Sequence, residues 1–188
     1  MDKIFIVGGG ASLKGFDWSL LKDRYVIAVN RAFEVLPSAE VIYFSDLRFW
    51  QWNSAELVNH KGRKVSLMRK MKHRKVELYT ATGVTGLDMS PGCLRHGNNS
   101  GYAAINLAAH LGAKEIVLLG FDMKFTNSQC HWHDGYPVVN LERSFDKMRK
   151  FFATLVSPLQ ELNIKVFNAN LESSLDVFPK IKYEEALS

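Results

Sequence analysis

Several features that mark particular protein classes are missing from this sequence. Its 188 residues include two cysteines, Cys93 and Cys130, which are too few for a disulfide framework and lack metal-ligand spacing. No stretch approaches the roughly 18 uncharged apolar residues that a membrane span requires. The apolar run Ile4–Val7 is ended by three glycines, too early for a signal peptide. We therefore expect a cytoplasmic protein with free thiols.

The common nucleotide-binding fingerprints are also absent. The run Gly8-Gly9-Gly10 lies between an apolar segment and a helix start, but position 13 is leucine. The third glycine of the dinucleotide motif is therefore missing, as are the lysine and Ser/Thr of a Walker A loop. Glycines at such a turn let backbone amides approach a phosphate. The turn is either a phosphate site of another kind or a tight structural connection.

Positive charge is unevenly distributed along the chain. The net charge is +5, and eight lysines and arginines fall within residues 61–75. A basic segment can attract phosphates, nucleic acid or an acidic glycan. No aromatic residues or nucleic-acid motif are interleaved with these charges, so nucleic acid is not the expected partner. The segment is more typical of a solvated edge strand and hairpin, where lysine discourages edge pairing.

Short apolar runs alternate with segments of helical spacing. The expected strands are 4–7, 25–29, 41–44, 65–68, 76–79, 116–119 and 165–167. The expected helices are 16–21, 31–36, 47–59, 100–111 and 141–162, with long loops at 80–98 and 120–140. This alternation predicts a Rossmann-like three-layer α/β/α fold with a mostly parallel sheet. We expect a single nucleotide-binding domain over residues 1–180 and a loose polar tail over 181–188.

Two helices carry clear end signals. Asn99 or Ser100 can cap the start of the helix at 100–111, and Gly112 can end it in a left-handed conformation. The helix at 141–162 has an amphipathic stripe, but Pro158 removes a backbone donor inside it. A kink or an early end is expected there.

Ligands of open parallel sheets bind outside the carboxyl ends of the strands, where the strand order reverses. Polar residues and glycines recur at these positions, and two of the candidate segments begin helices whose N-termini favour anions. The predicted nucleotide-binding residues are Gly8, Gly9, Gly10, Ser12, Asn30, Ser45, Asp46, Asn99, Ser100, Gly101 and Asp122.

The loop after the most apolar strand has the most reactive composition. Residues 130–136 contain two histidines, His131 and His133, an acid and two aromatic residues. Histidine titrates near neutral pH and can act as a general base or acid. His-x-His can also chelate a metal if Asp122 or Asp134 adds a ligand. A structural loop anchored by Trp132 is the third interpretation.

These residues, in this order, resemble the family 42 bacterial sialyltransferases and the related MptE-like (DUF115) Rossmann domains. Short proteins of phage and prophage origin are similar too. The resemblance lies in the opening turn, in a second signature and in the last strand with its loop. The corresponding segments are Val7–Leu13, Asn99–Ala103 followed by His110–Asp122, and Lys165–Asn170.

The resemblance implies an inverting, metal-independent glycosyltransferase that uses a nucleotide-sugar such as a CMP-sugar. It implies that His133, or otherwise His131, is the general base and that Tyr136 steadies the leaving phosphate. No cofactor is expected; the partners are a nucleotide or nucleotide-sugar and a glycan or other hydroxyl acceptor. At position 9 the sialyltransferases carry a nucleotide-contacting asparagine, and at position 11 a proline, where this chain has Gly9 and Ala11.

Two alternatives stay open beside this interpretation. An MptE-like pyrophosphokinase would use ATP and Mg²⁺ held by acids such as Asp46 and Asp122. A non-catalytic nucleotide-binding phage protein would need none of the histidines. The sequence leaves the oligomeric state open, a homo-oligomer included.

Overall fold

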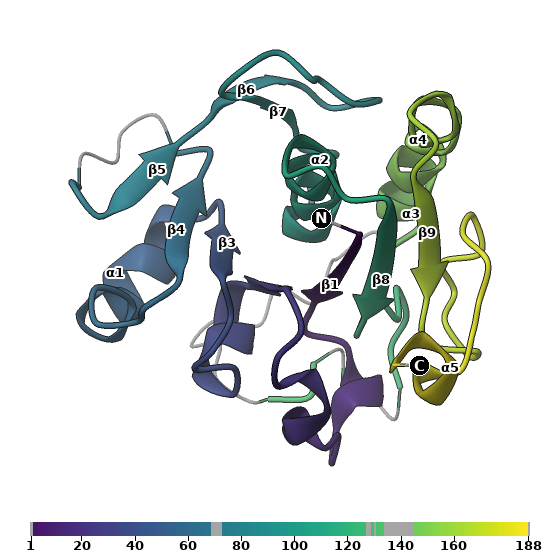
Figure 1. The fold of residues 1–188 in the computed structure, drawn as a ribbon, viewed down its shortest axis with the longest axis horizontal. Coiled ribbons are helices and arrows are strands. Elements are labelled where there is room, and N and C mark those ends of the chain that lie inside the picture. Colours follow the sequence, from purple (N-terminus) through teal and green to yellow (C-terminus); the bar gives the residue numbers. More distant parts are fainter. Residues whose placement is uncertain (1, 69–72, 127–128, 130, 134–144, 188) are drawn as a thin grey trace.

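The computed structural model describes residues 2–68, 73–126, 129, 131–133 and 145–187. Within these residues, seven parallel strands form one sheet in the order β5-β4-β3-β2-β1-β8-β9 (Figure 1). Runs of valine, isoleucine and leucine make the central strands suitable for burial on both faces. The strands are β1 (Lys3–Val7), β2 (Val26–Val29), β3 (Val41–Phe44), β4 (Arg63–Ser66), β5 (Val76–Leu78), β8 (Glu115–Leu119) and β9 (Lys165–Asn168).

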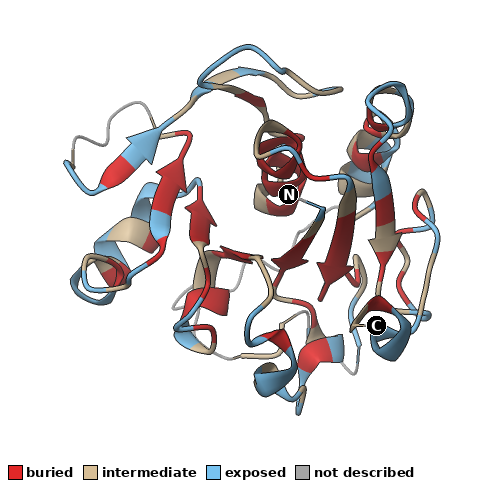
Figure 2. Ribbon diagram, in the orientation of Figure 1, coloured by how far each residue is buried: buried red, intermediate tan, exposed pale blue. Residues whose placement is uncertain are grey.

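Helices cover both faces of the sheet. One face packs against α2 (Ser100–His110), α3 (Phe145–Ala153) and α4 (Val156–Glu161). The other face packs against η1 (Ala11–Leu13), η2 (Trp18–Leu21), η3 (Asn30–Glu34), α1 (Leu47–Leu57) and α5 (Tyr183–Leu187). The predicted single α/β domain with three layers is confirmed, and Figure 2 shows the buried residues concentrated in the central strands and in α2.

Alternate side chains of β1 pack into the two hydrophobic cores, one on each face of the sheet. Ile4 and Ile6 point into the α2 side, and Phe5 and Val7 point into the α1 side, as the period of a strand requires. All four are at most 1% exposed. β1 pairs with β2 on one side and with β8 on the other. The strand order therefore reverses between β1 and β8, which is where the ligand rule places a binding site.

The caps predicted for α2 are confirmed. The Asn99 side chain accepts hydrogen bonds from the N–H groups of Gly101 and Tyr102, so Asn99 is the N-cap. At the other end, Gly112 has φ of +81°. The Ala113 N–H donates to the Ala108 carbonyl, and the Gly112 N–H donates to the carbonyl of Ala109. This is the bond pattern of a glycine-terminated helix.

The long helix expected at 141–162 is interrupted, as Pro158 predicts. Residues 141–144 lie outside the described residues; from Phe145 the helix runs to Ala153, and α4 begins at Val156. Pro158 has no N–H for the carbonyl four residues earlier, that of Thr154. Thr154 lies in the break, and its hydroxyl donates to the Phe151 carbonyl.

The expectations for residues 80–98 and for the C-terminal tail were wrong. Residues 80–98 do not form a plain loop, because β6 (Thr80–Gly83) and β7 (Cys93–Arg95) pair there as a separate parallel sheet. The tail expected to be loose over 181–188 contains α5, whose Ala186 is buried. Tertiary contacts hold this short helix, because Lys3 donates to the Ala186 carbonyl and Arg24 donates to the Leu187 carbonyl. Local composition gives no sign of such distant partners.

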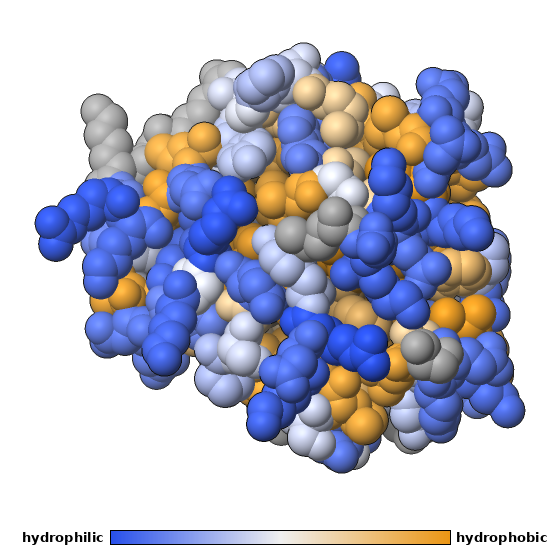
Figure 3. All heavy atoms as spheres, in the orientation of Figure 1, coloured by the Kyte–Doolittle hydropathy of each residue, from blue (hydrophilic) through white to orange (hydrophobic). Residues whose placement is uncertain are grey.

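The described residues of the basic segment, 61–68 and 73–75, lie at one edge of the sheet. β4 and β5 run parallel, so they do not form the expected hairpin. Arg63 forms a two-pronged ion pair with Glu77, and Lys75 donates to the carbonyl of Val58. Figure 3 shows mostly hydrophilic side chains over β4, β5 and α1. These bonds favour a structural role for Arg63 and Lys75 at a solvated sheet edge.

The helices that the structure describes include none of the length and apolar character needed to cross a membrane.

Candidate functional site

A cavity of about 1030 Å³ opens at the carboxyl edge of the sheet. It lies where β1, β2, β3 and β8 end, at the reversal of strand order. Residues from both anion-friendly segments, the glycine turn and the start of α2, share this one cavity. Its lining includes eleven residues that the sequence singles out: Gly8, Gly9, Gly10, Asn30, Ser45, Asp46, Asn99, Ser100, Gly101, Asp122 and His131.

The glycine turn is held tightly against the end of β8. The Gly8 N–H donates to the Leu119 carbonyl at 2.8 Å, and the Gly10 N–H donates to the Gly120 carbonyl at 2.9 Å. A Cβ at position 10 would lie 2.6 Å from the Gly120 carbonyl oxygen, so only glycine fits there. Because these two amides are already used inside the protein, a phosphate at this turn would depend on other donors, beginning with the Gly9 N–H.

Asp122 ties the turn to the far side of the site. It is 3% exposed and accepts hydrogen bonds from the Ser12 N–H, the Ser12 hydroxyl and the Asn170 side chain, at 2.8, 2.5 and 2.9 Å. Ser12 lies behind the turn, outside the cavity lining. The sequence predicts that Ser12 and Asp122 contact a nucleotide, whereas the contacts in the structure are to each other. Their positions indicate that they hold the turn in shape.

Neutral polar side chains form one wall of the cavity, here called the polar wall. The hydroxyl groups of Ser45, at the end of β3, and Ser100, at the start of α2, are 3.0 Å apart. Asn30, Asn98 and Asn99 line the same wall. Hydroxyl and amide groups both donate and accept hydrogen bonds. The wall can therefore match the hydroxyls of a ribose and the edge of a base.

Strained backbone is concentrated at this cavity. Asn30, Asn98 and Met123 have φ values of +52°, +52° and +49°, and all three are part of its lining. A positive φ is uncommon for residues other than glycine, and such strain is often kept at binding sites. Asn30 directly follows β2, Asn98 lies two residues before α2, and Met123 lies four residues after β8.

The histidine loop lies against the glycine turn. The Trp132 N–H donates to the Gly9 carbonyl at 3.0 Å, and the Trp132 ring N–H donates to the Gly8 carbonyl at 3.3 Å. His131 lines the cavity with Nδ1 3.2 Å from the Gly9 carbonyl oxygen. A carbonyl only accepts, so Nδ1 carries the proton and Nε2 is the basic nitrogen of neutral His131.

His133 lies behind His131 and not in the cavity lining. The two imidazole rings stack, with centroids 5.2 Å apart and an angle of 5° between their planes. Trp132 meets His133 edge to face at 4.8 Å and contacts Trp18 at 5.5 Å. The rings of Trp132 and Trp18 thus pack in a row next to the histidine pair. Tyr136 lies outside the described residues.

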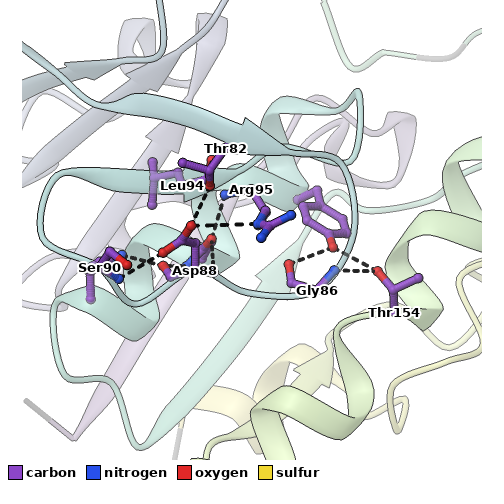
Figure 4. Close-up of polar contacts among 10 residues, drawn as sticks. Thr82, Gly86, Asp88, Ser90, Leu94, Arg95 and Thr154 are labelled. Carbon is purple, nitrogen blue, oxygen red and sulfur yellow. Dashed lines mark hydrogen bonds and ion pairs between the residues drawn. The ribbon is translucent and has the colours of Figure 1, made fainter.

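The wall formed by residues 80–98 depends on a polar network (Figure 4). The Asp88 carboxylate accepts from the Thr82 hydroxyl at 2.6 Å and from the Ser90 N–H at 2.9 Å. The Thr82 bond is the largest of several that lower the pKa of Asp88 to about 2. Asn106, fully buried in α2, binds the Asp88 backbone through both ends of its amide. The network fixes the segment that brings His96 and Asn98 to the cavity.

Several lining residues are absent from the sequence predictions. They come mainly from α1, from the loop after β8 and from α3, and include Arg48, Trp52, His96, Lys124, Lys147 and Met148. Burial lowers the pKa of His96, which favours its neutral form. Asp46 as an N-cap could have pointed to Arg48 and Trp52, because it begins the helix whose first turns carry both residues into the cavity lining. The residues of α3 reach the site only through the tertiary fold, which no local pattern reveals.

The described residues contain no group of three or more His, Cys, Asp or Glu side chains able to hold a metal ion. The two acids of the Mg²⁺ alternative are used differently. Asp46 caps α1 and pairs with Arg48, and Asp122 binds Ser12 and Asn170.

Comparison with known proteins reveals a likeness of fold. No family model matches the sequence, and no curated protein sequence matches it. Among solved structures, the chain is similar to the sialyltransferase CstII from Campylobacter jejuni, determined in complex with the substrate analogue cytidine-5'-monophosphate. The TM-score is 0.58 at 19% identity, covering 96% of this chain and 85% of that chain. At this identity the comparison shows a shared fold.

Proposed function

We propose that this protein is a glycosyltransferase that takes its sugar from a nucleotide-sugar donor of the CMP type. The observation that carries the proposal is the single cavity at the strand reversal, lined by both the glycine turn and the start of α2. Its hydroxyl and amide groups suit a nucleoside. The likeness of fold to a sialyltransferase determined with CMP adds support.

In the proposed reaction an acceptor hydroxyl attacks the anomeric carbon of the donor sugar. The new C–O bond forms as the bond from the anomeric carbon to the nucleotide phosphate breaks, and the bond's electron pair leaves with the phosphate oxygen. A single displacement inverts the anomeric centre. The Gly9 N–H and the first turn of α2 would face the departing phosphate, where aligned amide dipoles favour negative charge.

We assign the general base to His131, the second choice of the sequence prediction, and place His133 in support. His131 reaches the cavity, and its bond to the Gly9 carbonyl makes Nε2 the nitrogen that would take the acceptor's proton. The His133 ring stacks on the His131 ring and limits how it can turn. Trp132 fixes both by its two bonds to the turn.

Nucleotide binding is the first test. Thermal-shift and calorimetric titrations would compare CMP, CDP, UDP, GDP and ATP, each with and without Mg²⁺. We expect CMP or CDP to raise the melting temperature and to do so equally without the metal. A shift confined to ATP with Mg²⁺ would instead support a pyrophosphokinase. If no nucleotide binds, the proposal is wrong.

The histidine assignment is tested by hydrolysis of a CMP-sugar, in which water replaces the acceptor. His131→Ala should lower kcat by about 10²–10⁴-fold, the usual contribution of a general base, with CMP affinity within about twofold of the wild type. His133→Ala should cost about tenfold, because it removes support and not the base. Equal activity of His131→Ala and the wild type would contradict the assignment, and a larger loss in His133→Ala would return the role to His133.

A further inference from the structure

The part of the cavity lined by α1 and α3 differs in character from the polar wall. Here α1 contributes Leu47 and Trp52, and α3 contributes Phe145, Met148 and Phe151. Leu47 and Trp52 remain 43% and 42% exposed although they form part of a concave surface. Exposed apolar groups gathered in a cavity commonly mark a ligand surface. The residues proposed to bind the nucleotide belong to the polar wall and the glycine turn, so the apolar surface on α1 and α3 is left for a second molecule.

A fixed ion pair adjoins the apolar surface. Arg48 donates through Nε to both oxygens of Asp46 at 3.2 Å and through a terminal nitrogen to one of them at 2.8 Å. The Asp46 carboxylate also accepts from the backbone N–H of Arg48, since it caps α1. Both side chains keep substantial exposure, 47% for Asp46 and 63% for Arg48. The pair therefore presents guanidinium donors and carboxylate acceptors side by side, held together by their own hydrogen bonds.

Trp52 and Arg48 lie on the same side of α1. They are four residues apart, one helical turn, and both line the cavity. A flat aromatic face thus stands beside a polar fork. A pyranose ring has the complementary chemistry, because its C–H groups form an apolar face and its hydroxyls project from the edge. A rigid indole offers apolar contact area at low entropic cost.

We propose that Trp52 and the Asp46–Arg48 pair form the acceptor subsite and that it binds a pyranoside. The inference rests on the proposed function for its catalytic meaning. The sugar's apolar face would lie on the Trp52 indole, and neighbouring hydroxyls would meet the Arg48 donors and the Asp46 oxygens. Asp46 then serves the acceptor, in contrast to its predicted role in nucleotide binding. Trp52 acts as a specificity residue for the acceptor.

The test uses saturation-transfer NMR and calorimetry on the full chain saturated with CMP. The probes are methyl pyranosides and short oligosaccharides, added to the wild type, Trp52→Ala, Trp52→Phe and Arg48→Ala. We expect Trp52→Ala to weaken saccharide binding about tenfold, equal to about 1.4 kcal/mol of lost contact, with CMP affinity unchanged. Trp52→Phe should restore part of the loss, because it keeps an aromatic face.

Trp50→Phe is the matched control on the same helix. Trp50 stacks on Phe44 and is not part of the cavity lining, so saccharide binding should not change. The inference is overturned if no saccharide binds the CMP-loaded wild type, or if Trp52→Ala and Arg48→Ala bind saccharides as well as the wild type does. Failure of CMP itself to bind would count against the proposed function, while saccharide titration of the unliganded chain would still test the subsite.

Discussion

Gly9 and Gly10 are neighbours with different reasons for lacking a side chain. A Cβ at position 9 would lie 2.8 Å from Nδ1 of His131, whereas a Cβ at position 10 would meet the backbone carbonyl of Gly120 at 2.6 Å. An imidazole can move aside, but a carbonyl at the end of a buried strand cannot do so cheaply. Position 9 therefore controls where His131 lies, and position 10 controls the fold of the turn.

This difference predicts opposite outcomes for two matched substitutions. Gly9→Ala should leave the free energy of unfolding within about 1 kcal/mol of the wild type but lower kcat for CMP-sugar hydrolysis by displacing His131. Gly10→Ala should lower the free energy of unfolding by about 1–3 kcal/mol, as overpacking does. Urea unfolding and hydrolysis rates would be measured on both variants. A fully active Gly9→Ala would show that His131 does not depend on this contact.

The sequence located eleven of the residues that line the cavity but could not assign what each residue does. Glycines, serines and asparagines at strand ends were correctly placed at one edge, because parallel strands end together. Ser12 and Asp122 are 110 residues apart, and their hydrogen bonds form only in the folded chain. The same applies to the choice between His131 and His133, since two residues in one loop share every local signal.

Asn99 caps α2 and, under the proposed function, also lies beside the nucleotide phosphate. Asn99→Ala removes the N-cap and should cost about 1 kcal/mol of stability. Asn99→Asp keeps the capping oxygen but places a negative charge beside the expected phosphate. It should therefore keep the stability of the wild type and weaken CMP binding about tenfold. Urea unfolding separates the first effect, and calorimetry measures the second. Unchanged CMP affinity in Asn99→Asp would argue against a phosphate at this helix start.

The segment of β6 and β7 carries a pH-dependent contribution to stability. Hydrogen bonds from Thr82 and Ser90 lower the folded-state pKa of Asp88 to about 2, below the usual 3.8. A depressed pKa stabilises the fold above the unfolded-state pKa, and this contribution is lost as pH falls through the folded-state value. Between pH 5 and pH 2 the melting temperature of the wild type should thus fall more steeply than that of Asp88→Asn.

Thr82→Val tests the role of the Asp88 carboxylate in a second way. This substitution removes the hydrogen bond that lowers the pKa of Asp88 most. The fall in its melting temperature between pH 5 and pH 2 should therefore lie between those of the wild type and Asp88→Asn. Parallel melting curves for all three proteins over this pH range would show that Asp88 does not couple this segment to pH.

Among the elements, the sequence succeeded where the cause is local. The helix break near Pro158 and the glycine end of α2 follow from one residue each. β6, β7 and α5 were missed because their stabilising contacts come from elsewhere: Asn106 of α2 binds the 80–98 segment, and Lys3 and Arg24 bind α5. Short polar strands and a five-residue helix show little periodicity of their own.

The molecule as a whole divides its cavity between two kinds of surface. The polar wall, at the strand reversal, presents amides and hydroxyls, and the surface on α1 and α3 presents apolar groups and the Asp46–Arg48 pair. His131 lines the same cavity from the loop after β8. This arrangement fits a donor nucleotide on the polar wall and an acceptor sugar on the surface of α1, both in one cavity.

The central claim is that a nucleotide phosphate lies between the glycine turn and the start of α2. A ¹H–¹⁵N NMR titration of the full chain with CMP tests it directly, because backbone amides report contact residue by residue. We predict that the amide signals of Gly9, Ser100 and Gly101 move most. Bound CMP that leaves these three signals in place, with the largest changes on β4 and β5 instead, would contradict the account.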